Sequence, residues 1–336
     1  MSIKKFLIGC AMVLAASATF AKTKIVTTIF PEYDWVKQIV GNKTKDAEIT
    51  LLIGNGVDLH SYQPSIQDIA KISTADIFIY VGGESDEWVD GVLKSARNKN
   101  MKVINLMEVL GDRVKEEEVV EGMQEEDEHE HHHDEDEDEH EHEHHHHHSS
   151  DEEELEYDEH VWLSVRNAKI LCAEICNALC AKDSKNAATY KANCASYSAK
   201  LDKLDSDFAA AVKNGKTKTL LFGDRFPFRY LVDDYNLKYY AAFAGCSADS
   251  EASFETVAFL SEKLTELMLP AVLTIDSSDG KLARTIIDTS GNSSAQILSL
   301  NSMQAVTKDM IKSETDYIGM MESNLDVLKT ALAVKK

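Results

Sequence analysis

Histidine is concentrated in one short segment of this 336-residue chain. Eleven of the 13 histidines fall in the run HEHHHDEDEDEHEHEHHHHH, where they alternate with Asp and Glu. Neutral imidazole suits zinc, copper, nickel and iron, whereas carboxylates alone would suit calcium or magnesium. A purely acidic, solvated insert does not need histidine, so the run favours transition-metal binding. The histidines of this tract are His129, His131, His132, His133, His140, His142, His144, His145, His146, His147 and His148.

The two remaining histidines, His60 and His160, stand in the segments GVDLHSYQPS and DEHVWLSVRN. A single histidine in a fold is more often structural or exposed than a metal ligand. These two are the only histidines outside the tract, and Asp58 and Asp158 precede them by two residues. A nearby carboxylate can orient a ligand imidazole. We therefore expect His60 and His160 to bind a metal together.

Polar residues also stand at the ends of predicted strands, where ligands bind parallel α/β sheets. His60 follows AEITLLI, Asp224 ends TLLFGD, Asp276 follows AVLTI, and Asn301 follows AQILSL. The two aspartates are candidate metal ligands. Each could equally cap the helix that follows it.

Catalytic motifs give little support for an enzyme. Three H-E-x-x-H matches begin at His129, His140 and His142, but the metalloprotease signature needs a stable helix, and these lie in a low-complexity tract. The chain contains no G-x-S-x-G, Walker or G-x-G-x-x-G motif. Nothing in the sequence arranges a nucleophile beside a base, and we expect a binding protein.

The net charge of −23 comes from one region. Residues 116–159 contain 24 Asp or Glu and no Lys or Arg, while the whole chain has 58 acids and 35 bases. The remainder is therefore close to neutral, and no basic patch indicates nucleic-acid binding. The acidic segment produces a local field that concentrates cations.

The amino terminus has the pattern of an export signal. Lys4 and Lys5 precede FLIGCAMVLAA, and small residues end at Ala21. The apolar stretch is too short for a comfortable membrane span. Cys10 stands too early in this stretch for a lipoprotein cleavage site. We expect a periplasmic or otherwise extracytoplasmic protein.

Outside the acidic segment, strands and helices alternate, which predicts parallel sheets covered by helices. The predicted strands cover residues 24–30, 47–53, 76–82, 102–107, 219–224, 238–245, 271–277 and 295–300. The predicted helices cover residues 31–39, 64–72, 87–96, 167–181, 186–212, 227–234, 254–268, 281–287 and 309–333. The fold class is α/β, with two lobes, one long rigid helix between them and a disordered His/Asp/Glu-rich insert. We expect a signal peptide over 1–21, an N-terminal lobe over 22–115 and 158–183, the insert over 116–157, the linker helix over 184–214 and a C-terminal lobe over 215–336.

Several segments resemble one known family. The segments GVDLHSYQPSIQDIAKISTADIFIYVGG and DEHVWLSVRNAKIL, the insert between them and the closing YIGMMESNLDVLKTAL look like the zinc- and manganese-type substrate-binding proteins of ABC importers. The resemblance covers nearly the whole mature chain. It implies a monomeric envelope protein that binds a divalent metal between two lobes and passes it to a membrane permease with a cytoplasmic ATPase.

The second half departs from the family's pattern. Gly223 stands where a histidine commonly precedes the aspartate, here Asp224, and Asn301 stands where an aspartate commonly closes the site. Asp276 occupies a position usually held by a carboxylate. The resemblance therefore implies a ligand set of His60, His160 and Asp276, with Asp224 or a water completing it.

Such a site could hold zinc, manganese or iron, and affinity rises from manganese toward copper and zinc. The histidine tract favours zinc as the cargo. An envelope zinc buffer or sensor without transport is the competing class. A zinc hydrolase would also need an open coordination position, a general base and a substrate pocket.

Overall fold

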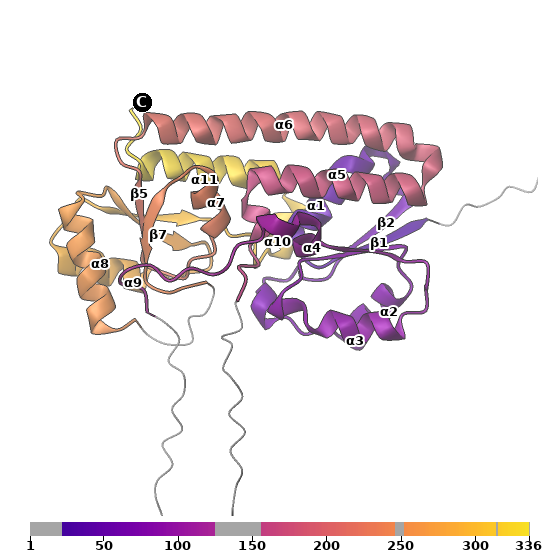
Figure 1. Cartoon of the computed structure of the whole chain (residues 1–336), viewed down its shortest axis with the longest axis horizontal. Helices are drawn as coiled ribbons and strands as arrows, with labels where there is room; N and C mark the ends of the chain where they lie inside the picture. Colours follow the sequence, from indigo (N-terminus) through magenta and orange to yellow (C-terminus); the bar gives the residue numbers. More distant parts are fainter. Residues whose placement is uncertain (1–21, 125–155, 246–251, 314, 336) are drawn as a thin grey trace, which may run out of the picture.

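The computed structural model describes residues 22–124, 156–245, 252–313 and 315–335, which form two α/β lobes (Figure 1). The predicted signal peptide and all eleven histidines of the tract lie outside these ranges. Within them, no helix combines the length and the apolar character needed to cross a membrane.

The N-terminal lobe contains a parallel sheet of four strands in the order β2-β1-β3-β4. Its strands are β1 (Thr23–Thr27), β2 (Ala47–Leu51), β3 (Ile77–Tyr80) and β4 (Lys102–Asn105). Its helices include α1 (Phe30–Val40), α2 (Ile66–Ser73), α3 (Trp88–Ser95) and α4 (Leu106–Leu110). Strand β3 reads IFIY and is buried at every position, as expected for an inner strand covered on both faces.

The C-terminal lobe repeats this topology with the order β6-β5-β7-β8, again all parallel. Its strands are β5 (Thr219–Phe222), β6 (Lys238–Ala241), β7 (Ala271–Ile275) and β8 (Gln296–Leu300). Its helices are α7 (Arg229–Asp234), α8 (Phe254–Glu266), α9 (Lys281–Ser290), α10 (Lys308–Lys312) and α11 (Tyr317–Ala331). The predicted α/β class with two parallel sheets is confirmed.

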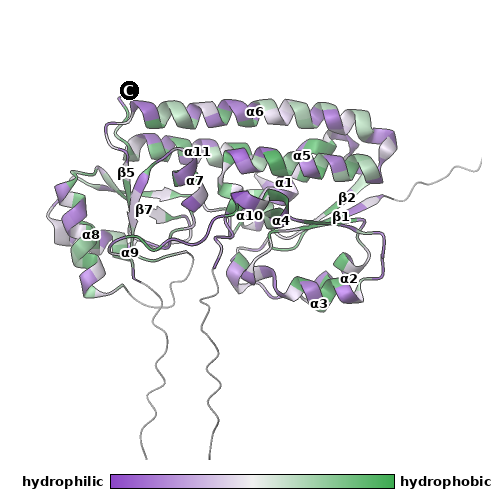
Figure 2. Ribbon diagram, in the orientation of Figure 1, coloured by the Kyte–Doolittle hydropathy of each residue, from purple (hydrophilic) through white to green (hydrophobic). Residues whose placement is uncertain are grey.

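Two long helices, α5 (Val165–Lys182) and α6 (Ala187–Asn214), form a hairpin, in which α6 runs along both lobes and α5 lies beside the N-terminal lobe (Figure 1). The 28 residues of α6 extend about 42 Å. Hydrophilic and hydrophobic residues alternate along α6, as expected for a helix with one buried face (Figure 2). The hydroxyl of Ser164 caps α5 by accepting the Asn167 N–H at 3.0 Å. The predicted long helix is present.

The lobes also meet directly. The ring centroids of Trp35, in α1, and Tyr317, in α11, are 5.3 Å apart. The Tyr317 backbone N–H donates to the Asp34 carboxylate at 3.0 Å, and its hydroxyl donates to the Trp162 carbonyl at 2.7 Å. Residues of both lobes therefore belong to one continuous hydrophobic core.

Several predicted strands end a few residues too late, such as 238–245 for β6, and two of the wrong boundaries have a clear local reason. The helix predicted over residues 309–333 is divided into α10 and α11, because the Asp316 carboxylate accepts the Gly319 N–H at 2.7 Å and starts a new helix. The strand predicted over residues 102–107 ends at Asn105, whose side chain accepts the Glu108 N–H at 3.1 Å and caps α4.

Candidate metal centre

His60 lies in a short 3₁₀ turn, Leu59–Ser61, on the chain that connects β2 to α2. The Asp58 carboxylate accepts the His60 backbone N–H at 3.1 Å and fixes this turn. The ring atom Nδ1 is 2.8 Å from the Ser85 hydroxyl and 3.8 Å from Oε2 of Glu159. These contacts orient the ring so that its Nε2 atom faces the C-terminal lobe.

His160 lies three residues after the end of the insert and is 1% exposed. Oδ1 of Asp158 accepts the His160 backbone N–H at 2.8 Å and lies 2.9 Å from the ring Nδ1. An ionised carboxylate only accepts hydrogen bonds, so it favours the tautomer with hydrogen on Nδ1. The ring lone pair is then on Nε2, the nitrogen that faces the side chains of His60 and Gln304. The Trp162 ring packs beside the imidazole, with centroids 5.2 Å apart.

The two predicted histidines meet. Their Nε2 atoms are 3.2 Å apart although the residues are 100 positions apart in the sequence. The Nε2 atom of Gln304 lies 3.0 Å from His60 Nε2 and 2.9 Å from His160 Nε2. A tetrahedral zinc ion with bonds of about 2.0–2.1 Å holds its donor atoms about 3.3 Å apart. The three side-chain ends are therefore spaced like one face of a zinc coordination tetrahedron.

Gln304 is a candidate ligand that the sequence analysis missed. It is 2% exposed and lies in the turn after β8. Its amide N–H groups can donate to the lone pairs of both imidazoles, and a half-turn of the amide would present its oxygen to a metal instead. The sequence signal that could have identified Gln304 was its position four residues after the strand, in the turn that contains Asn301.

Asn301, which stands where the family commonly has the aspartate that closes the site, has a structural role. Its backbone N–H donates to the Asn324 side chain at 2.8 Å, and its own side chain accepts the Met303 N–H at 2.8 Å. Met303 has a φ of 59°. These contacts reverse the chain after β8 and place Gln304 beside the histidines.

Asp276 contacts the same turn. Its carboxylate accepts the Ser302 N–H at 2.9 Å and the Ser302 hydroxyl at 3.1 Å. The Ser302 carbonyl in turn accepts the Trp162 indole N–H at 2.9 Å. Asp276 is thus connected to the His160 side of the site through Ser302 and Trp162. It also lines a cavity of about 790 Å³ in the C-terminal lobe.

Among the described residues, Asp224 is linked to the site only through its neighbour Arg225. One carboxylate oxygen accepts the Arg225 N–H at 2.9 Å, and the other is buried without a hydrogen-bond partner. Arg225 forms an ion pair of 3.6 Å with Asp58, which holds the His60 turn. Across the described ranges, no three His, Cys, Asp or Glu side chains are grouped to hold a metal. The roles of Asp276 and Asp224 as ligands stay predictions.

The position of Gly223 has no space for the histidine that commonly stands there in the family that this chain resembles. A Cβ atom there would lie 2.9 Å from the Ala283 Cα and 2.9 Å from a Val272 methyl group. The Gly223 position therefore faces the packed interior of the C-terminal lobe, and a larger side chain would disrupt it.

Buried carboxylates surround the histidine pair from the N-terminal lobe. Burial raises the pKa of Asp86 to about 7, and the nearby Glu159 carboxylate also raises it. The Val81 and Gly82 N–H groups donate to Asp86 at 2.9 and 3.1 Å. Oε2 of Glu159 is 3.8 Å from His60 Nδ1, and Oδ1 of Asp158 is 2.9 Å from His160 Nδ1, so a carboxylate stands behind each imidazole and favours a cation at the site.

Two α/β lobes that meet where the partly exposed His60 and the buried His160 face Gln304 define a two-lobed metal-binding protein. The comparisons with known proteins agree. The family described as "Zinc-uptake complex component A periplasmic" matches residues 25–331. The chain belongs to this ZnuA family.

Individual relatives carry related descriptions. The zinc-binding lipoprotein AdcA of Streptococcus pneumoniae is 32% identical over 324 residues, which cover 96% of this chain and 58% of that protein. The chain thus spans somewhat more than half the length of the first curated relatives. The high-affinity zinc uptake system protein ZnuA of Bacillus subtilis is 30% identical and is covered over 97% of its length, with 98% of this chain aligned.

Solved structures share the fold. The Zn(II)-bound ZnuA-like domain of Streptococcus pneumoniae AdcA matches with a TM-score of 0.67 and 29% identity, covering 93% of this chain and 99% of that domain. The metal-dependent lipoprotein YcdH of Bacillus subtilis matches with a TM-score of 0.71 and 27% identity, covering 93% of this chain and all of that one.

Proposed function

We propose that this protein binds Zn²⁺ between its lobes outside the cytoplasm and delivers it to an ABC importer. Its membership of a zinc-uptake family and its relatives named as zinc-binding proteins support this role. The partners would be a membrane permease and its cytoplasmic ATPase. The predicted signal peptide, which lies outside the described residues, would direct export.

The observation that carries the proposal is the triangle formed by His60, His160 and Gln304. Two imidazole nitrogens and an amide oxygen would supply three donors, and Asp276, Asp224 or a water would supply the fourth. Zinc accepts nitrogen and oxygen donors in a tetrahedral arrangement. Imidazole also favours zinc over manganese, because affinity for such ligands rises along the series toward zinc.

We further propose that the histidine tract collects zinc for this site. The tract ends at His148, 12 residues before His160. Residues 125–148 contain no apolar residue that could hold metal ligands in a fixed core, whereas the folded site has its side chains already placed. The tract would therefore bind several ions weakly, and the interlobe site would bind one tightly.

The domain boundaries remain part of the proposal. An N-terminal lobe over residues 22–115 and 158–183 and a C-terminal lobe over 215–336 would each supply part of the metal site. Residues 184–214 would act as the stiff link between them, since α6 occupies most of this range.

Zinc titration of a chain that lacks residues 125–148 tests the proposal. We expect this chain to bind one zinc ion tightly. We expect His60→Ala and His160→Ala each to weaken zinc binding at least ten- to hundredfold, because loss of a group that only hydrogen-bonds to a metal ligand already costs that much. Gln63→Ala, at an exposed residue three positions after His60, is the matched control. Unchanged titration curves for both histidine variants would contradict the proposal.

A further inference from the structure

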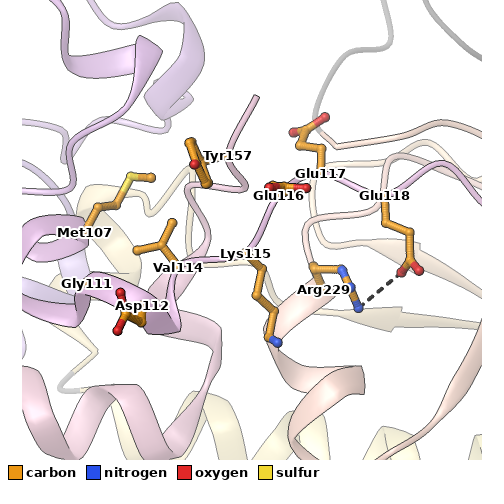
Figure 3. Close-up of a pocket in the computed structure, with 10 residues that line it drawn as sticks. All are labelled: Met107, Gly111, Asp112, Val114, Lys115, Glu116, Glu117, Glu118, Tyr157 and Arg229. Carbon is orange, nitrogen blue, oxygen red and sulfur yellow. Dashed lines mark ion pairs between the residues drawn. The ribbon is translucent and has the colours of Figure 1, made fainter. Parts of the chain in front are cut away.

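The two ends of the insert form a short antiparallel stem. Glu116 and Tyr157 are bridge partners, the Glu117 N–H donates to the Glu156 carbonyl at 2.9 Å, and the Asp158 N–H donates to the Lys115 carbonyl at 2.9 Å. We call residues 115–118 and 156–158 the stem. Its residues 115–118 and Tyr157 line an open groove of about 770 Å³ together with Arg229 of α7 (Figure 3). The stem thus connects the insert to the residues just before His160.

One hydrogen bond of the stem is replaced by a side chain of the C-terminal lobe. In an antiparallel ladder, hydrogen-bonded pairs, whose residues exchange two backbone hydrogen bonds, alternate with pairs that exchange none. Glu116 and Tyr157 are a pair of the second kind, so Lys115 and Asp158 stand where a hydrogen-bonded pair is expected. Lys115 and Asp158 make only one of the two bonds directly. The Tyr230 hydroxyl occupies the place of the other, because it accepts the Lys115 N–H at 3.0 Å and donates to the Asp158 carbonyl at 2.7 Å.

The Tyr230 hydroxyl is connected to the metal site through one residue, Asp158. Asp158 is 2% exposed, and its carboxylate holds both the backbone N–H and the ring Nδ1 of His160. We propose that Tyr230 is a positioning residue for zinc binding, because its hydroxyl sets the place of Asp158 and thereby the orientation of the His160 ring. The inference rests on the proposed function, in which His160 binds zinc.

Other contacts keep the stem on the C-terminal lobe without the Tyr230 hydroxyl. Glu118 forms an ion pair of 3.2 Å with Arg229, drawn in Figure 3, and accepts the Tyr239 hydroxyl at 3.1 Å. The Gln124 N–H donates to the Ala242 carbonyl at 2.9 Å. Removal of one hydroxyl therefore changes the Lys115–Asp158 pair while the stem stays docked.

Tyr230→Phe removes the bridging oxygen and leaves the ring in place. The Lys115 N–H and the Asp158 carbonyl then lack a partner, and the direct ladder bond becomes the favoured replacement. Closing this bond draws Asp158 toward Lys115 and away from the geometry that holds His160. Groups that orient a metal ligand typically contribute ten- to hundredfold to metal affinity.

The test uses the mature full-length chain loaded with Zn²⁺ and freed of weakly bound zinc by gel filtration. The rate of release of the remaining zinc into excess EDTA is measured. We expect Tyr230→Phe to release zinc about ten times faster than the wild type. Tyr190→Phe is the matched control, because Tyr190 is also buried and its hydroxyl donates to Asp183, in the hairpin turn between α5 and α6.

A second measurement separates positioning from general destabilisation. We expect the ring N–H signal of His160 in ¹⁵N NMR spectra to shift in metal-free Tyr230→Phe and to stay unchanged in Tyr190→Phe. Wild-type release rates for Tyr230→Phe, or equal acceleration by both variants, would overturn the inference. His160→Ala in the same assay tests the proposed function. If this variant retained tightly bound zinc, the proposed function would be wrong. If it lost zinc while Tyr230→Phe behaved like the wild type, only the positioning role of Tyr230 would be refuted.

Discussion

Replacement of Gln304 tests how the site binds zinc without a third histidine. The structure places the Gln304 amide 2.9–3.0 Å from both imidazole Nε2 atoms and buries it to 2% exposure. If its oxygen binds zinc, the residue at this position should set the affinity in the order Glu, Gln, Ala, Leu. Glutamate adds a negative charge next to the cation, alanine leaves space for a water ligand, and leucine fills that space with an apolar group.

The expected magnitudes follow from these substitutions. Loss of even an outer partner of a metal ligand typically costs ten- to hundredfold in affinity. For Gln304→Leu we therefore expect a loss of at least about 1.4–2.7 kcal/mol of zinc-binding free energy, since a factor of ten corresponds to about 1.4 kcal/mol. Gln304→Ala should lose less, because a water can occupy the vacated position.

The assay is competition for Zn²⁺ between each variant and a chromophoric chelator, in the chain that lacks residues 125–148. Circular dichroism of each metal-free variant checks the fold. Gln296→Leu, at an exposed position at the start of β8, is the control for an amide-to-leucine change. Equal affinities for all four residues at position 304 would refute the reasoning and exclude Gln304 from the coordination sphere.

Three further predictions concern the carboxylates and the tract. Asp276→Asn keeps an acceptor for Ser302 but removes a charge, so we expect weaker zinc binding in the competition assay; unchanged affinity would leave Asp276 only the role of holding the turn. Deletion of residues 125–148 should reduce the number of zinc ions per chain in native mass spectrometry to one, and complete loss of tight zinc would place the high-affinity site in the tract. Burial raises the pKa of Glu32 to about 8 from an ordinary value of 4.5, so the folded state binds more protons than the unfolded state between these values. Stability should therefore fall as the pH rises from about 5 to 8, and Glu32→Gln should flatten this dependence in chemical denaturation, whereas identical slopes for both proteins would contradict the shift.

The sequence was sufficient to predict the histidine pair for a simple reason. His60 and His160 are the only histidines outside the tract, and each follows an aspartate by two residues, so the sequence predicted that they act together. The 3.2 Å between their Nε2 atoms confirms that they lie together, and their metal binding stays a prediction. The alternation of strands and helices likewise predicted two parallel sheets. The contact between the two lobes, however, depends on the packing of Trp35 against Tyr317, which no local sequence pattern reveals.

Gln304 was missed because its role depends on backbone geometry. A neutral amide carries no metal-binding signature, and the strand-end rule pointed to Asn301. The positive φ of Met303 turns the chain so that Gln304, and not Asn301, lies beside the histidines. The break between α10 and α11 was missed for a similar reason, since the cap at Asp316 interrupts an otherwise helical apolar pattern.

The most direct test of the account is a crystal structure of the zinc-loaded protein with diffraction data collected at the zinc absorption edge. The account predicts that the strongest anomalous peak lies between His60 and His160, within about 2.0–2.1 Å of both Nε2 atoms. A strongest peak elsewhere in the folded lobes, with both imidazoles free of metal, would contradict it.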